Sequence, residues 1–205
     1  MEENADMHWI VFALAMLGQG PPKGGQMDYA DGFLMGRADS PVRIEVYSDL
    51  QCPSCRTFYL YTVTSLMKEY SAGGKVAIIF HDFPLVTHPV SRVATRYAVA
   101  AKSLGREKWA RVIEDLYTYQ AQWSYDGKIE PILSRTLTAD ELQAIKAKLN
   151  DPAIEQAIDR EVALGNEKKV DQTPTVFVTM GGREQRLAGG LSFPVFKQFI
   201  DRSVN

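Results

Sequence analysis

The sequence predicts an α/β domain that is interrupted by an all-helical insertion. Two β-branched, aromatic segments flank one long helical segment in the first half of the chain. A long region with helical signals follows, and the chain then returns to strand patterns before a closing helix. Strands that share one sheet across such an interruption indicate a single α/β unit with an inserted helical block.

Length and composition are those of a globular protein. The chain has 205 residues, of which 45% are apolar and 23% are charged, and its formal net charge is −2. It is long enough to bury a core without disulfides or metals. The charge balance gives no sign of a nucleic-acid surface. No apolar run approaches the ~20 residues that a membrane-spanning helix needs.

Residues 1–35 are expected to form an N-terminal segment and linker. The apolar run 9–17 has the length of a signal peptide, but acidic residues precede it where a secretory signal carries Lys or Arg. An atypical export segment and a short packed or partner-docking helix therefore both stay open. The glycine- and proline-rich residues 18–32 favour a flexible linker.

Residues 36–87 are expected to hold a strand, a helix and a second strand. PVRIEVYSD, residues 41–49, and KVAIIFHDF, residues 75–83, have the composition of buried strands. Between them a helix is expected to run from Pro53 to the glycines at 73–74. This order is typical of a βαβ unit, so the two strands are predicted to be parallel.

Residues 88–170 are expected to form the helical insertion. Pro89 is placed in the first turn of its first helix, and a second helix is expected over 107–123. Thr138 and Glu141 have the spacing of a capping box. Asp151, which a proline follows, is expected to cap the last helix.

Residues 171–205 are expected to complete the α/β unit. The segment 173–180 reads as a strand, and a turn at 181–184 leads to a short partner strand over 185–190. Ser192 is expected to cap a closing helix.

Cys52 and Cys55 are the only cysteines, and they lie three residues apart. The loop they close is too short to stabilise a fold much. Cys52 falls where a strand ends and a helix begins, with Pro53 as a natural first helical residue. A sulfur at a helix N-terminus is favoured as the thiolate, which is the nucleophilic form. Cys55, one turn further on, is predicted to be the shielded sulfur that attacks a mixed disulfide on Cys52.

Two other interpretations of the cysteines stay open, a zinc site and an inert buried pair. A structural zinc site needs four ligands, and only His8, His81 and His88 could join the cysteines. None of these histidines has a pairing spacing, and His81 and His88 are expected to be a strand-end residue and a helix cap. We therefore expect no metal and no bound cofactor.

Thr173 and Pro174 open the strand in the last part of the chain. A proline at such a position can follow a cis peptide bond. A cis bond would leave the backbone of Thr173 free to pair with an extended peptide. A trans proline that simply begins an edge strand is the alternative.

Taken together, SPVRIEVYSDLQCPSC, FHDFPLVTHP, the helical block and TPTVFV with a later AGG resemble the DsbA-like family. The resemblance covers roughly residues 36–203 and implies a thioredoxin fold interrupted by an inserted all-helical domain. It also implies that Cys52 is the nucleophile and Cys55 the resolving cysteine. By the same resemblance Thr173 and Pro174 form a cis-proline loop that faces the dithiol.

Two positions depart from the family pattern. Family members commonly carry a buried acid six residues before the first cysteine, where this chain has Val46. Glu45 is adjacent, but alternation along a strand directs it to the opposite face. DsbA has His between the cysteines, where this chain has Ser54. The pKa of Cys52 is therefore expected to be lowered, but less than in a protein with that histidine.

The resemblance implies a thiol–disulfide oxidoreductase of the bacterial cell envelope, periplasmic or secreted. We expect it to act on protein or peptide thiols and disulfides, docked against Pro53, Ser54, Thr173 and Pro174 over apolar residues of the helical insertion. Disulfide formation is favoured, and a reductase, an isomerase and a non-catalytic peptide-binding or chaperone-like module are the alternatives. A monomer, an unidentified redox-recycling partner and no nucleic acid are expected.

Overall fold

The computed structural model describes residues 33–202, whose five strands form one mixed sheet in the order β1-β3-β2-β4-β5. β2 is parallel to β3, whereas β1 pairs antiparallel with β3, β4 with β2, and β5 with β4. The strands are β1 Phe33–Met35, β2 Val42–Ser48, β3 Val76–Asp82, β4 Thr175–Met180 and β5 Arg183–Ala188. The predicted parallel βαβ unit and the C-terminal hairpin are confirmed.

The short strand β1 corrects the prediction that residues 1–35 are a segment and linker. Phe33–Met35 pairs with the outer edge of β3. An edge strand of three residues after a glycine carries too little alternation to be recognised from the sequence. The apolar run 9–17 and the expected linker 18–32 lie outside the described residues.

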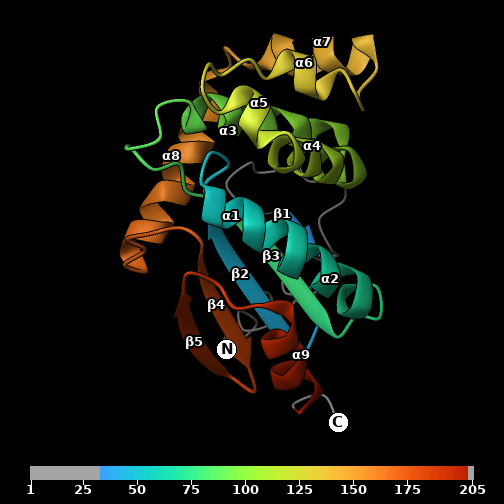
Figure 1. Cartoon of the computed structure of the whole chain (residues 1–205), viewed down its shortest axis with the longest axis vertical. Helices are drawn as coiled ribbons and strands as arrows, with labels where there is room; N and C mark the ends of the chain where they lie inside the picture. Colours follow the sequence, from blue (N-terminus) through green and yellow to red (C-terminus); the bar gives the residue numbers. More distant parts are fainter. Residues whose placement is uncertain (1–32, 203–205) are drawn as a thin grey trace, which may run out of the picture.

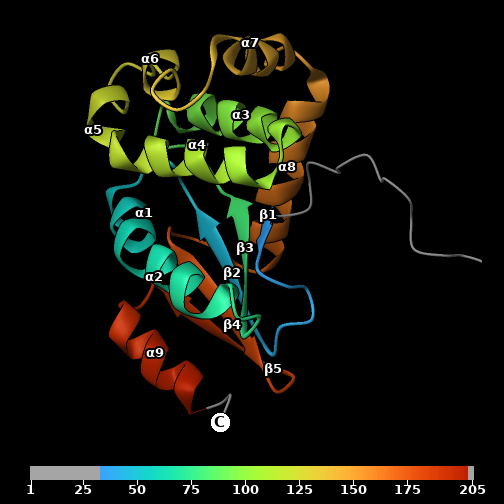
Figure 2. The same ribbon diagram turned by 90° about the vertical axis from the view of Figure 1, so that its right-hand side faces the viewer.

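One continuous helical segment crosses from β2 to β3. It consists of α1 Pro53–Phe58, η1 Tyr59–Val63, α2 Thr64–Leu66 and η2 Met67–Ser71, and both η stretches are π-helical. Figure 2 shows α1, α2 and α9 (Phe193–Asp201) along one face of the sheet, with α8 (Pro152–Glu167) on the other side. The face that holds α1 is the face of the candidate site.

Most of the helical block lies at the end of the sheet where β2 and β3 finish, and α8 runs from there alongside the sheet (Figure 1). It contains α3 Ser91–Ala101, the 3₁₀ turn η3 Lys102–Leu104, α4 Arg106–Thr118, α5 Gln120–Trp123, α6 Glu130–Leu133, α7 Ala139–Lys148 and α8 Pro152–Glu167. Its buried side chains join those of the sheet and α1 in one continuous core. Within the described residues, no helix is both long and apolar enough to cross a bilayer.

The helix ends show which local predictions hold. The capping box of Thr138 and Glu141 is formed in both directions, and Asp151 accepts from the N–H of Ala153. Ser192 is at the N-cap of α9, but its side chain makes no capping hydrogen bond there.

Three predictions about the helical block are corrected. The first helix starts at Ser91 with Val90 at its N-cap, so Pro89 precedes it and His88 does not cap it. The expected helix over 107–123 is broken at Tyr119, whose backbone (φ −100°, ψ 21°) leaves the helical region. His88 instead contacts the loop that follows β2.

Candidate active site

Cys52 lies at the junction between β2 and α1, where it is the N-cap residue of the helix. Its backbone is extended (φ −71°, ψ 123°), and Pro53 follows in the first turn. The carbonyl oxygen of Cys52 accepts from the N–H of Arg56 at 3.1 Å. The first turn of α1 contains no acidic residue. Its N–H groups therefore favour a negative charge at Cys52.

The two sulfurs have opposite acid–base properties. The pKa of the Cys52 thiol is lowered to about 5, chiefly because the Cys55 side chain hydrogen-bonds its sulfur. Burial opposes this change, and the backbone N–H groups of Cys55 and Ser54 add to it. The pKa of the Cys55 thiol is raised well above its ordinary value, because burial disfavours its charged form. One sulfur is thus set up as a thiolate at neutral pH and the other as a thiol.

Cys52 is more exposed than Cys55, as predicted, but the difference between the two exposed fractions is small. Both cysteines are free thiols in this structure. Cys52 is 7% exposed and Cys55 is 0% exposed. Cys52 is therefore the more accessible of the two cysteines, although it is itself largely covered.

The loop before β4 covers the dithiol. The Cys52 sulfur lies 3.4 Å from the carbonyl oxygen of Thr173, to which it donates in its protonated form, although 121 residues separate them. The peptide bond between Thr173 and Pro174 is cis. Pro174 is buried, and its carbonyl oxygen accepts from the N–H of Gly189 at 2.8 Å. The structure thus brings the predicted Thr173–Pro174 pair and Cys52 together.

Asp49 organises the loop that delivers Cys52, and the sequence reasoning did not identify it. Its side chain is 0% exposed. Both carboxylate oxygens lie within hydrogen-bond distance of polar groups, which are Gln51 N, Cys52 N, Ser91 Oγ, Leu85 N and His88 Nδ1, at 2.7–3.1 Å. An acid followed by a turn residue at the end of a strand could have been recognised as a turn former.

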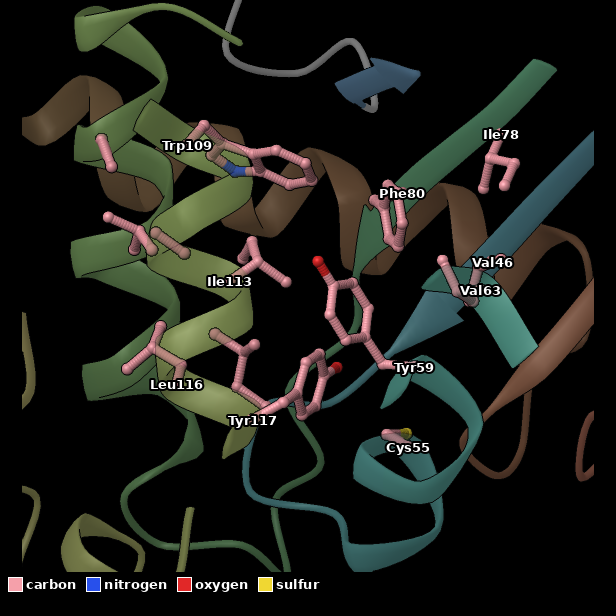
Figure 3. Packing of buried hydrophobic residues seen from close by; sticks show 14 of the residues in the cluster. Val46, Cys55, Tyr59, Val63, Ile78, Phe80, Trp109, Ile113, Leu116 and Tyr117 are labelled. Carbon is pink, nitrogen blue, oxygen red and sulfur yellow. The ribbon is translucent and has the colours of Figure 1, made fainter. Parts of the chain in front are cut away.

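The surroundings of Cys55 contain hydroxyl groups in place of a carboxylate. Val46 is 1% exposed and packs in the apolar core, as Figure 3 shows. Glu45 lies on the opposite face of β2, where it pairs with Lys168 at 2.7 Å. The Ser48 side chain, on the face of Val46, interacts with Cys55 and opposes the rise in its pKa. Glu45 therefore lies on the face away from Cys55, as strand alternation predicted, and it does not serve Cys55 as a proton acceptor.

A groove of about 480 Å³ runs beside the N-terminal turn of α1. One wall comes from α1 and η1, including Pro53, Ser54 and Tyr61, and the other from residues 189–192. Tyr61 is 69% exposed. The apolar surface next to Pro53 and Ser54 therefore comes from the thioredoxin-like part. The prediction that the helical insertion supplies it is wrong for this groove.

The histidines are engaged in pairs. His81 Nδ1 lies 2.6 Å from Glu161 Oε2, and His88 Nδ1 lies 2.9 Å from Asp49 Oδ2. His8 is outside the described residues. Among residues 33–202, no cluster of three or more His, Cys, Asp or Glu side chains could hold a metal ion.

Sequence comparison places the chain among proteins of disulfide chemistry. A family model described as thioredoxin matches residues 29–201. The probable disulfide bond formation protein D of Bacillus cereus is 23% identical over 200 residues, which cover 94% of this chain and 88% of that protein. The disulfide bond formation protein D of Bacillus subtilis is 22% identical over 161 residues, covering 75% and 70%.

Solved structures share the fold. The crystal structure of Wolbachia pipientis alpha-DsbA1 superposes with a TM-score of 0.71 at 21% identity, over 84% of this chain and 90% of that chain. Oxidised BdbD from Bacillus subtilis superposes with a TM-score of 0.70 at 18% identity, over 84% and 92%. A thioredoxin fold with an inserted helical block is therefore confirmed.

Proposed function

From its membership of the thioredoxin family, and from a fold shared with DsbA-like proteins, we propose that this chain is a thiol–disulfide oxidoreductase that works through Cys52 and Cys55. The observation that carries the proposal is the lowered pKa of Cys52, whose sulfur lies 3.4 Å from the carbonyl oxygen of Thr173. A thiolate at neutral pH is the species that exchanges disulfides.

Each turnover moves two electrons. In the oxidising direction, a substrate thiolate attacks Sγ of Cys52 in the Cys52–Cys55 disulfide, and the electron pair of the broken S–S bond leaves on Cys55. A second substrate thiolate then attacks the substrate sulfur of the mixed disulfide, and Cys52 leaves as a thiolate. The substrate loses two electrons and becomes a disulfide, while the protein dithiol gains them.

Disulfide formation is the direction we propose. A stabilised Cys52 thiolate stabilises the reduced protein, so the disulfide form is an oxidant. The same chemistry run backwards gives a reductase, and repeated exchange gives an isomerase. The reduction potential distinguishes these directions.

The substrate that fits is an extended segment of a protein or peptide. Pro53 and Ser54 border both the dithiol and the groove, and Thr173 and Pro174 border the dithiol from the other side. We propose that the backbone next to the reacting sulfur lies against Thr173 and that neighbouring side chains enter the groove. The protein would act as a monomer with a separate redox-recycling partner, in the cell envelope or outside the cell.

The domain assignment is part of the proposal. Residues 36–87 and 171–205, together with the edge strand β1, would form the thioredoxin-fold part that carries the chemistry, and residues 88–170 the insertion. Tyr117 of the insertion contacts Ser48 at the end of β2, and Ser91 contacts Asp49 in the loop that follows. The insertion would therefore support the site from behind.

Redox equilibration with glutathione tests the direction. We expect a potential between about −120 and −230 mV, the range from strongly oxidising family members to glutaredoxins. A value near −270 mV, as in thioredoxin, would indicate a reductase. An insulin-reduction or dithiol-oxidation assay separates an enzyme from a binding module, because a module that only binds peptides gives no turnover.

A further inference from the structure

We propose that the Ser48 hydroxyl, oriented by the hydroxyl of Tyr117, passes protons to and from the Cys55 sulfur; this inference rests on the proposed function. Ser48 is the last residue of β2, and Tyr117 lies on α4 of the helical block. The two hydroxyl oxygens are 2.7 Å apart across 69 residues of sequence. The thioredoxin-like part and the insertion thus both contribute to this pair.

Cys55 needs a proton partner in every turnover. Its side chain is fully buried. When the disulfide is broken by an attack at Cys52, Cys55 becomes a thiolate away from water, and a buried thiolate is costly. In the reverse direction the Cys55 thiol must lose its proton before it can attack a mixed disulfide.

The groups that face Cys55 from each packed element identify Ser48 as this partner. They are Cys52 at the N-cap of α1, the Asp49 N–H at 3.4 Å and Ser48 at the end of β2. Tyr117 from α4 lies behind Ser48, whose hydroxyl it contacts. Cys52 is the reacting sulfur and the Asp49 N–H is a backbone donor that keeps its proton. Ser48 is the group that can both donate and accept a proton at this sulfur.

Tyr117 holds the Ser48 hydroxyl in place. Figure 3 shows the Tyr117 ring projecting from α4 toward the helix that carries Cys55, with Tyr59 beside it. The two rings are stacked with centroids 4.8 Å apart. Burial raises the pKa of Tyr117 well above its ordinary value, so its hydroxyl remains protonated and can donate to Ser48.

A small cavity lies beside this pair, and its lining includes the partly exposed Asp82. Its volume is about 10 Å³, and its lining includes Ser48, Tyr117, His81 and Asp82. This is close to the size of one water molecule. The apolar side chains of Leu50, Phe80, Trp109 and Ile113 form the rest of the lining, so the polar groups of Ser48, Tyr117, His81 and Asp82 are the ones that could hold a water there. Asp82 is 14% exposed and pairs with Lys102 at 3.4 Å.

The proton transfer balances as follows. Ser48 gives its proton to the Cys55 thiolate as the S–S bond breaks and takes one from the Tyr117 hydroxyl, which regains a proton from water at the cavity. In the reverse direction each proton moves back, and the Cys55 thiolate forms the S–S bond with Cys52 while the substrate thiolate leaves. Neither hydroxyl is consumed, and Cys55 exchanges one proton with solvent.

The test follows the resolving step in the full-length protein. The reduced protein is mixed with oxidised glutathione, and the glutathione adduct on Cys52 is quantified by acid quench and mass spectrometry. We expect Ser48→Ala to slow the decay of the adduct by about 10- to 100-fold at neutral pH, at the lower end of typical general acid–base effects. Its pH profile should move upward, because Cys55 loses a group that stabilises its thiolate. Ser48→Thr, which keeps a hydroxyl, should restore most of the rate.

A matched pair of tyrosine variants isolates the role of Tyr117 as a positioning residue. Tyr117→Phe keeps the stacked ring and should slow the decay several-fold, whereas Tyr59→Phe removes a hydroxyl from the neighbouring ring and should leave the rate near that of the wild type. Thermal unfolding identifies any variant that fails to fold. Adduct decay in Ser48→Ala at the wild-type rate and with the wild-type pH profile would overturn the proposal. A wild-type protein that forms no adduct on Cys52 would instead refute the proposed function.

Discussion

Cys52 and Cys55 stand one helical turn apart, yet their surroundings give them opposite properties. Cys52 meets backbone N–H groups and the Cys55 side chain, and its pKa falls to about 5. Cys55 meets the apolar core, and burial raises its pKa. Because the largest contribution at Cys52 comes from Cys55, the two pKa values belong to the pair. The asymmetry therefore depends on what packs around the turn and not on the CPSC motif alone.

Replacing each cysteine in turn by serine is expected to give the largest difference between Cys52 and Cys55. Cys55→Ser should form a long-lived mixed disulfide with a reduced, unfolded thiol protein after oxidation, because the resolving sulfur is absent. Cys52→Ser should form none, since Cys55 is fully buried. Non-reducing electrophoresis measures both. Equal trapping by the two variants would mean that the roles of the sulfurs are not distinct.

Asp49→Asn tests how firmly the Cys52 side of the turn is held. Both carboxylate oxygens of Asp49 accept buried hydrogen bonds. In the variant one of these oxygens becomes an NH₂ group, which would face hydrogen-bond donors and leave them without an acceptor. We expect the free energy of unfolding to fall by about 1–3 kcal/mol, the cost of unsatisfied buried donors. Urea denaturation measures it, with Asp39→Asn as the control.

That control removes a carboxylate of similar chemistry at the surface. Asp39 forms an ion pair with Arg37, and both side chains are about 70% exposed. Its replacement should change stability by less than about 0.5 kcal/mol, as is usual for exposed positions. If Asp49→Asn were as mild as Asp39→Asn, the loop before Cys52 would not depend on this carboxylate.

Gly190→Ala tests the groove beside Cys52. Gly190 has φ +66°, and an added Cβ would lie 2.7 Å from Cδ2 of Phe58. We expect the KM for a thiol peptide to rise while the alkylation rate of Cys52 stays the same. Gly181→Ala shares the positive φ, +54°, but its Cβ would meet open space. An unchanged KM in Gly190→Ala would show that substrates do not use this groove.

The pH dependence of stability is a smaller effect of known sign. The folded pKa of Cys52 lies below its unfolded value of about 8.5, so the unfolded protein binds more protons between these values. The stability of the reduced form should therefore rise with pH across this window and be lost as pH falls through about 5. The oxidised form, which has no thiolate, is the control in denaturant titrations. Parallel curves for the two forms would contradict the lowered pKa.

The sequence predicted the parts of the site that are local. The end of a strand before Cys52 and the start of a helix at Pro53 are recognised within a few residues, and the structure has both. Ser48 with Tyr117, and Asp49 with His88, could not be predicted because they pair across long stretches of chain. Their contacts depend on how the helical block docks on the sheet, and no local pattern records that docking. The edge strand β1 was missed for a different reason, since three residues carry no periodicity.

The central claim is that Cys52 alone is a thiolate at neutral pH, and thiolate absorbance of the reduced protein against pH tests it most directly. The absorbance should rise with a midpoint near pH 5 in the wild type. That step should be absent in Cys52→Ser and in the oxidised protein, and no second step should appear before alkaline pH, because burial raises the pKa of Cys55. A single step at or above about 8.5, the value of a free thiol, would contradict the account.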